Sequence, residues 1–166
     1  MKRTRPTQEQ LRQLFSYNDD GTFTRLVKTG IRTFVGEIVN TVPNNLGYRH
    51  TCVNGNRWNM HTLIWIYHYG DIQENMQIDH INGVRCDNRI ENLRICTHSQ
   101  NQQNRKMPIS NRSGYIGVSW YTRDKKWRSV IRVDGKLHYL GYFNDPEEAY
   151  KVYLEAKKKY HTFNPN

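Results

Sequence analysis

The chain has 166 residues, which is room for one medium domain or two small ones. Lysine and arginine number 25 against 15 aspartate and glutamate, so the formal net charge is +10. No stretch approaches the roughly 18 consecutive apolar residues that a membrane span needs. Three cysteines at no metal-like spacing make neither a disulfide framework nor a zinc ribbon. These features exclude a membrane protein and a secreted disulfide scaffold, and the charge favours an anionic polymer as partner.

The start of the chain predicts a helix. Thr7 is a good N-cap, and Gln10 stands three residues further on, as a capping box requires. An apolar stripe follows at helical spacing: Leu11, Leu14 and Phe15. We expect this helix to end in the segment 18–21, which reads Asn-Asp-Asp-Gly. No apolar segment follows the basic first residues, so we expect no secretory signal and a soluble protein of a reducing compartment.

Short strands and a buried helix follow. We expect a strand over 22–27 and a hairpin over 47–60 that turns at Asn54-Gly55. Residues 61–69 read as a buried helix closed by Gly70. The next expected elements are a strand ending at 77–80, a turn at Asn82-Gly83, a polar loop to 92, a strand over 93–96 and a polar helix over 99–106.

Beyond residue 106 the pattern changes. The segment 107–113 has no periodicity and reads as a linker. Three alternating strands follow, over about 115–121, 127–133 and 136–142, with Asp134-Gly135 at the second turn. Asp145 and Pro146 then start a helix, in which a predicted face covers the sheet: Ala149, Val152, Tyr153, Ala156 and Tyr160. We expect Cys52, Cys86 and Cys96 to be buried small apolar residues.

The residues with the clearest chemistry lie between 78 and 104. Asp79 and His80 are neighbours at a strand end, so one side chain can meet a metal while the other meets a water. A hard divalent ion takes oxygen ligands, and a carboxylate with the amide oxygen of Asn101 supplies two. Imidazole has a near-neutral pKa and suits a general base. These parts predict metal-assisted phosphodiester hydrolysis.

The stretch Ile78 to Asn104 carries the pattern IDHINGxxxDNRxxNLRxxTxxxNxxN. It resembles the HNH endonucleases of the ββα-metal class, in the phage and intron-borne branch without zinc-binding cysteines. The resemblance covers roughly residues 7–106. It implies that Asp79 and Asn101 hold Mg²⁺ or another divalent cation such as Mn²⁺, with no structural zinc. His80 is then the general base, and Asn92 completes the catalytic motif by holding the long loop across it.

Purely structural roles are alternatives for several of these residues. Asn92 and Asn101 also suit capping and turn positions, and His61 fits a packed or capping histidine better than a catalytic one. His98 suits either a helix start or a phosphate contact. The run Lys157 to Lys159 is more typical of a solvated helix end than of a DNA clamp.

The C-terminal segment carries a second pattern, in Ser113-Gly114-Tyr115-Ile116-Gly117-Val118, Lys126-Trp127 and Leu140-Gly141-Tyr142-Phe143. It is similar to the AP2/ERF DNA-binding domain, in which a three-stranded sheet lies in the major groove. Strand alternation places Trp127, Ser129, Ile131 and Val133 on the core face, with Val118 and Trp120 also pointing inward. The expected DNA face carries Ser119, Tyr121, Arg123, Arg128, Val130, Arg132 and Tyr139.

Together these patterns predict an α+β protein. An N-terminal ββα-metal (HNH) nuclease domain spans 1–106, a linker 107–113, and an AP2/ERF-like domain, a three-stranded antiparallel sheet packed on one helix, 114–166. The resemblance implies a homing-type endonuclease that cuts double-stranded DNA, as a monomer or weak dimer, in the cytoplasm of a phage-infected or bacterial cell, without membrane contact. Two alternatives stay open: a non-catalytic DNA-binding regulator, and a nuclease that acts on RNA or branched DNA.

Overall fold

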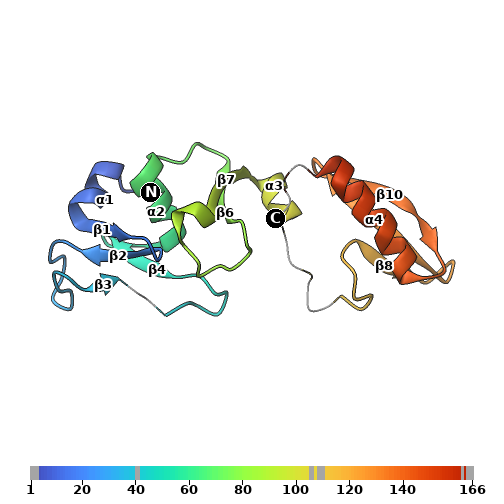
Figure 1. Ribbon diagram of the computed structural model, residues 1–166, viewed down its shortest axis with the longest axis horizontal. Coiled ribbons are helices and arrows are strands. Elements are labelled where there is room, and N and C mark those ends of the chain that lie inside the picture. Colours follow the sequence, from blue (N-terminus) through green and yellow to red (C-terminus); the bar gives the residue numbers. More distant parts are fainter. Residues whose placement is uncertain (1–3, 40–41, 105–106, 108–110, 162, 164–166) are drawn as a thin grey trace. The chain divides into compact units, whose positions relative to one another are not determined.

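The computed structural model describes residues 4–39, 42–104, 107, 111–161 and 163. The chain forms two compact units, residues 1–97 and 98–165, and each is described by itself below. Figure 1 colours the chain along its sequence and labels most of its elements. The described residues have a mixed α and β composition, with four α-helices and several small antiparallel sheets.

The first unit begins with the expected capped helix, although it is shorter than predicted. Helix α1 (Gln8–Leu14) carries the complete capping box between Thr7 and Gln10. The prediction that the helix continues to the segment 18–21 is wrong, because Phe15 is extended and begins strand β1 (Phe15–Asn18). Its ring stacks on Phe23 of strand β2 (Thr22–Arg25), with 5.1 Å between the ring centroids. Pairing with a neighbouring strand therefore overrides the helical pattern.

Strand β3 (Ile38–Val39) completes a sheet of order β1-β2-β3. The expected hairpin is confirmed as β4 (His50–Val53) and β5 (Asn56–Asn59), turning at Asn54 and Gly55, which both have positive φ. Helix α2 (Met60–Tyr69) follows and ends at Gly70, as predicted. The residues of this unit's core share nearly complete burial: Leu11, Phe15, Phe23, Met60, Leu63, Ile64 and Ile66.

The first unit ends with the hairpin that carries the candidate chemistry. Strand β6 (Met76–His80) ends at His80, as expected. A long loop and a 3₁₀ turn (Ile90–Asn92) lead to strand β7 (Leu93–Thr97). The two strands pair antiparallel, with Asp79 opposite Arg94 and His80 opposite Leu93.

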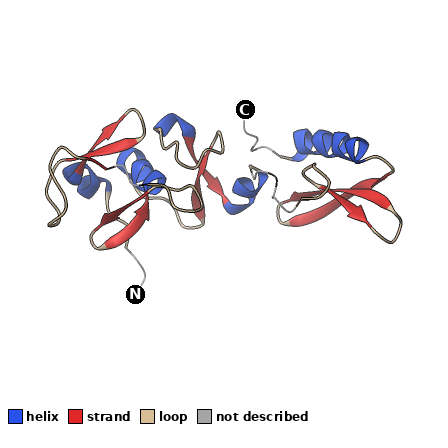
Figure 2. Cartoon of the chain, turned by 90° about the horizontal axis from the view of Figure 1, so that it is seen from below, coloured by secondary structure: helices blue, strands red, loops and turns tan. Residues whose placement is uncertain are grey.

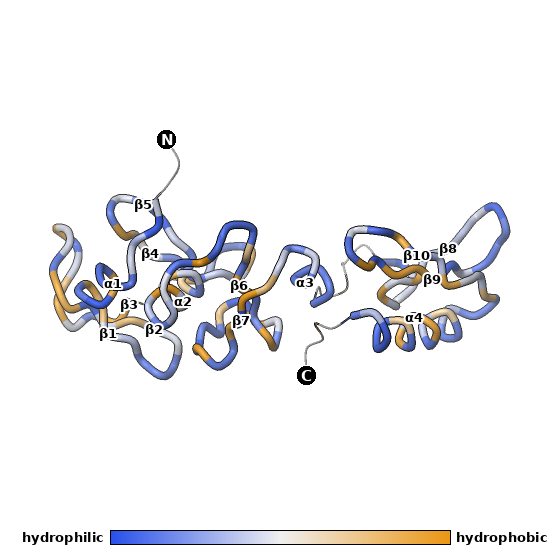
Figure 3. The backbone as a smooth tube through the Cα atoms, turned by 90° about the horizontal axis from the view of Figure 1, so that it is seen from above, coloured by the Kyte–Doolittle hydropathy of each residue, from blue (hydrophilic) through white to orange (hydrophobic). Residues whose placement is uncertain are grey.

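The second unit contains helix α3 (His98–Gln103) and a three-stranded sheet of order β10-β9-β8. The strands are β8 (Val118–Tyr121), β9 (Lys126–Val133) and β10 (Lys136–Phe143). Helix α4 (Pro146–Tyr160) begins at the predicted cap Asp145 and lies along one sheet face (Figure 2). Figure 3 shows apolar and polar stretches alternating along α4. Residues 105–106 of the predicted polar helix, and 108–110 of the predicted linker, lie outside the described residues.

The core of the second unit lies between α4 and the sheet. Ile131 packs with Tyr153 and Ala156, and Ser129 is fully buried beside them, as strand alternation predicts. Two predictions about inward residues are wrong. Trp120 is 49% exposed, because it lies on an edge strand with its ring edge-on to Trp127. Tyr160 is 44% exposed at the end of α4, although its ring stacks with that of His138 on β10.

The expectation of three buried cysteines is confirmed for Cys96 only. Cys52 is exposed, because β4 pairs only with β5 and turns this position outward, and Cys86 is half-buried in the loop after β6. Burial raises the pKa of the Cys96 thiol to about 11.

Candidate active site

His80 lies at the buried end of β6 and forms a hydrogen bond with Asn88. Its Nε2 lies 3.1 Å from Oδ1 of Asn88, whose side chain is 1% exposed. The amide Nδ2 of Asn88 donates to the carbonyl of Cys86, so Oδ1 faces the imidazole and accepts from Nε2–H. This tautomer leaves the lone pair of the neutral ring on Nδ1. The hydrogen bond to Asn88 therefore leaves Nδ1 as the proton-accepting atom of the candidate base.

Burial also keeps the imidazole of His80 neutral. Burial lowers the pKa of His80 below its ordinary value, and the bond to Asn88 and the charges of Asp79 and Asp87 oppose this shift. A histidine with a lowered pKa is unprotonated at neutral pH, which is the form that a general base requires.

Two other aromatic rings of the first unit lie close to the imidazole of His80. His61, from the first turn of α2, lies edge-on to it with 4.9 Å between ring centroids. Tyr48 lies 5.4 Å from His61 and 6.1 Å from His80. Burial lowers the pKa of His61 to about 3, so this second imidazole is neutral as well. The sequence indicated a packed residue at His61, and the structure places that packing directly against the candidate base.

The carboxylate of Asp79 forms an ion pair across the hairpin. Its Oδ2 accepts from Nε and Nη2 of Arg94 at 3.1 and 3.0 Å. Both side chains are largely buried, so the arginine fixes the orientation of the carboxylate. Sequence analysis missed Arg94, although the facing positions of the two strands pair these opposite charges directly.

Asn92 bridges the two ends of the loop between β6 and β7. Its Oδ1 accepts from the backbone N–H of Asn82 at 3.0 Å, and its Nδ2 donates to the carbonyl of Asp87 at 2.8 Å. The backbone carbonyl of Asn92 also accepts from the N–H of Ile81. The side chain thereby fixes the loop in which Asn88 contacts His80.

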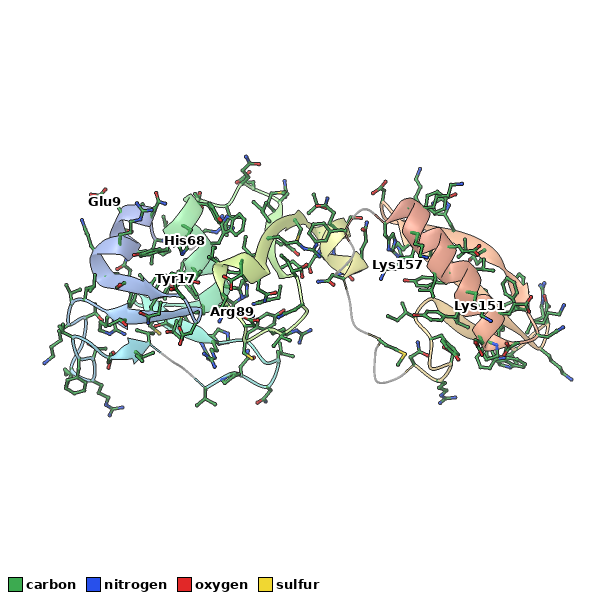
Figure 4. All side chains as sticks on the ribbon, in the orientation of Figure 1. Glu9, Tyr17, His68, Arg89, Lys151 and Lys157 are labelled. Carbon is green, nitrogen blue, oxygen red and sulfur yellow. The ribbon has the colours of Figure 1, made fainter. Side chains whose placement is uncertain are left out.

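The β1–β2 hairpin supports the same loop from outside. The hydroxyl of Tyr17 accepts from the backbone N–H of Ile90 at 3.0 Å. Gly21, at the hairpin turn, has a φ of +79°, and a Cβ there would lie 2.4 Å from the backbone nitrogen of Arg89. Tyr17 and Arg89 are labelled in Figure 4, on the hairpin and on the loop respectively. Sequence analysis missed this contact, because it joins segments about seventy residues apart.

The other expected metal ligand, Asn101, lies half-buried on α3 and belongs to the second unit. Asp79 and Asn101 offer the hard oxygen donors that Mg²⁺ takes alongside several waters. Among the described residues, no group of three His, Cys, Asp or Glu side chains is arranged to hold a metal ion. Asp79 and Asn101 lie in different units, and the carboxylate of Asp79 is paired with Arg94.

The sheet face opposite α4 presents an arginine among tyrosines. The guanidinium of Arg128 lies 5.6 Å from the ring centroid of Tyr121 and 5.9 Å from that of Tyr139, and it donates to Ser119. Arg123 lies over Tyr121 and pairs with Asp124. We call the following set the outer sheet face: Ser119, Tyr121, Arg128, Val130, Arg132, Tyr139 and Tyr142.

Tyr142 joins this face through a β-bulge that the sequence did not indicate. Tyr139 pairs with Val130, whereas Gly141 pairs with Ser129, so Leu140 is the extra residue. Leu140 packs into the core with Ile131, and the register beyond it is shifted by one. As a result Tyr142 lies opposite Arg128, 5.2 Å from Tyr121, on the same face as Tyr139.

Comparison with known proteins finds a family match in the middle of the chain. Residues 58–103 match the family model described as HNH endonuclease. The match runs from β5 to α3 and includes Asp79, His80, Asn88 and Asn92. It supports the presence of an HNH nuclease domain. Enzymes of the HNH class generally act on DNA and use divalent metal ions. The match lies in the middle of the chain rather than at its N-terminus.

One curated relative is a phage protein. Protein 3.8 of Escherichia phage T7 is 36% identical over 78 residues, which is 47% of this chain. The chain covers 64% of the length of that relative. No solved structure matches the chain. Among the helices that the structure describes, none has the length and apolar content of a membrane span.

Proposed function

We propose that this protein is a metal-dependent endonuclease that hydrolyses phosphodiester bonds in double-stranded DNA. The observation that carries the proposal is the buried His80, neutral and held by Asn88 so that Nδ1 is the basic atom. It directly follows Asp79, whose carboxylate is fixed by Arg94, inside the segment that matches the HNH endonucleases.

The chemistry follows from these groups. His80 Nδ1 accepts a proton from water as the water attacks phosphorus, while Nε2–H stays bonded to Asn88. Asp79 and Asn101 would hold a divalent cation, as the resemblance to the ββα-metal nucleases implies. When bound, that ion neutralises charge on the phosphate and on the leaving 3′ oxygen. The products expected from the family resemblance carry 5′-phosphate and 3′-hydroxyl ends.

We further propose that one domain cuts DNA and the other binds it, as the sequence suggested. Residues 1–106 form the nuclease domain, residues 107–113 a linker, and residues 114–166 an AP2/ERF-like domain. The outer sheet face, with Arg123, then binds duplex DNA and places the cut. The observation in support is the Arg128–Tyr121–Tyr139 cluster, in which Tyr139 is exposed and the other two are half-buried, since arginine with aromatic rings suits phosphate and base contacts. The phage relative supports a setting in a phage-infected cell, and the family resemblance implies a homing-type role there.

Plasmid cleavage tests the proposal. Wild-type protein with Mg²⁺ should nick supercoiled plasmid, and EDTA should stop the reaction. His80→Ala should lower the rate by about 100-fold or more, because the base is gone. Its DNA affinity should stay within about threefold of wild type, because the base contributes little to phosphate contacts. His138→Ala removes an exposed histidine of β10 and is the matched control. Equal cleavage by His80→Ala and wild type would contradict the assignment.

One observation favours a non-catalytic DNA-binding protein as second candidate. The carboxylate of Asp79 is already paired with Arg94, which opposes metal binding. In that case the protein binds DNA, but Mg²⁺ and Mn²⁺ produce no nicks in any substrate. The same assay with RNA and branched DNA as competitors identifies a preference for either substrate over duplex DNA.

A further inference from the structure

A rigid turn of the first unit lies before β4 and consists of residues Asn44 to Tyr48. The side-chain oxygen of Asn44 accepts from the N–H groups of Leu46 and Tyr48, both at 3.0 Å. The backbone N–H of Asn44 donates to the carbonyl of Tyr48, and Gly47 has the positive φ that closes the turn. The backbone on both sides of Leu46 is therefore fixed.

This turn is fastened to the loop that follows β6. Nη1 of Arg85 donates to the carbonyl of Leu46 at 2.8 Å, and its guanidinium lies 5.1 Å from the ring centroid of Tyr48. Since Tyr48 also lies against His61 and His80, the turn borders the candidate base.

The turn presents an apolar side chain beside a cation. Leu46 is 63% exposed, and Arg85 is exposed next to it. Within the residues that the structure describes, Arg85 forms no ion pair with a carboxylate. Single exposed leucines are common on protein surfaces. Here the leucine stands on a backbone held by three hydrogen bonds, two to the side chain of Asn44 and one from Arg85.

We infer that Leu46 and Arg85 form a DNA contact beside the bond that is cut. Arg85 contacts a backbone phosphate, and Leu46 packs as a wedge between adjacent bases. Apolar wedges beside arginines unstack base steps in this way and distort the duplex. The positive charge of Arg85 selects duplex DNA as the occupant, rather than a second copy of this chain with its net charge of +10. This inference rests on the proposed function, because it assumes that DNA approaches His80.

A plasmid-unwinding assay tests the wedge without knowledge of the target sequence. Relaxed plasmid is incubated with the full-length protein and a metal-independent topoisomerase in EDTA, which prevents cleavage. An inserted wedge unwinds the helix and leaves a measurable change in linking number. We expect Leu46→Ala to lower this change by half or more at equal occupancy. Val35→Ala, which alters an apolar residue of similar exposure, should leave it unchanged.

Affinity and cleavage measurements complete the test. Arg85→Gln should weaken DNA binding and reduce the slope of log affinity against log salt by about 0.9, as expected for one lost phosphate contact. Leu46→Ala should slow nicking at saturating DNA about tenfold, because the scissile bond is less well placed.

The outcomes separate this inference from the proposed function. Equal unwinding by wild type and Leu46→Ala overturns the wedge, and so does DNA binding without any unwinding, even if the protein nicks plasmid. Unwinding that depends on Leu46, in a protein that never nicks plasmid with Mg²⁺, supports the wedge and overturns the nuclease.

Discussion

At the scale of single residues, the hydrogen bond from His80 to Asn88 has the largest consequence for chemistry. It fixes both the ring orientation and the tautomer of the candidate base. We predict that Asn88→Leu lowers the single-turnover cleavage rate by about 10- to 100-fold, since the ring loses its hydrogen-bond acceptor. DNA affinity should not change.

The conservative variant provides the control. Asn88→Asp keeps an oxygen acceptor at the same place, and we expect it to retain more activity than Asn88→Leu. Equal rates for the two variants would show that Asn88 only fills space.

A second residue-scale prediction concerns pH and His61. The native pKa of His61 is about 3, whereas an unfolded histidine titrates near 6.5. Between these values the unfolded chain binds a proton that the native state excludes. The contribution of neutral His61 to the free energy of unfolding is therefore fully present above pH 6.5, and it is lost as the pH falls toward 3. At pH 4.5 the loss from this group is about 3 kcal/mol.

Replacement of His61 by phenylalanine removes this titration and keeps a ring against His80. Hydrogen-exchange protection of the α2 amides should fall between pH 7 and pH 4.5 in wild type, and it should fall less in His61→Phe. An identical fall in both proteins would assign the acid sensitivity to other groups.

At the scale of elements, the β1–β2 hairpin acts as a support for the loop that holds Asn88. Gly21 at its turn combines a φ of +79° with a close approach to the backbone of Asn88 and Arg89. Gly55, in the β4–β5 turn, has a φ of +71° but open space around its Cβ position. Substitution at Gly55 measures the free-energy cost of a left-handed backbone alone. Substitution at Gly21 adds the cost of a steric clash with the loop.

We predict that Gly55→Ala costs about 1–2 kcal/mol, from the left-handed backbone alone. Gly21→Ala should cost clearly more and should also slow cleavage, since the loop must move away from the hairpin. Thermal unfolding and plasmid nicking of the two variants measure both effects. Equal losses would show that the hairpin does not support the loop.

The elements that the sequence predicted well are those with local signals. The capping box at Thr7, the turns at Asn54-Gly55 and Asp134-Gly135, and the cap at Asp145 are each written in two to four adjacent residues. The errors arise where distant partners decide. Phe15 leaves the helix for a strand because of Phe23, and the bulge at Leu140 is set by packing on Ile131.

The same distinction holds for the candidate site. Asp79 and His80 stand side by side in a recognisable motif, so the sequence alone pointed to them. Asn88 and Arg94 contact them from 8 and 15 residues away, through the loop and across the hairpin. Tyr48 and His61 reach the site from other elements, so no spacing in the sequence indicates them.

At the scale of the whole molecule, two compact units carry different chemistry. The first unit holds the neutral base and the paired carboxylate, whereas the second presents arginines and tyrosines on an open sheet face. If the second unit supplies affinity and the first supplies hydrolysis, changes on the sheet should act on binding alone.

We therefore predict that Arg128→Ala combined with Arg132→Ala raises the KM for plasmid nicking and leaves kcat within about twofold. Loss of interactions that are made equally in the ground state and the transition state has this effect. The salt slope of binding should fall by about 0.9 for each phosphate contact removed. Lys151→Ala removes an exposed cation from α4, on the opposite side of the sheet, and should change neither value. A fall in kcat with unchanged KM would mean that the sheet acts in the chemical step, and the two units would then not divide the work as proposed.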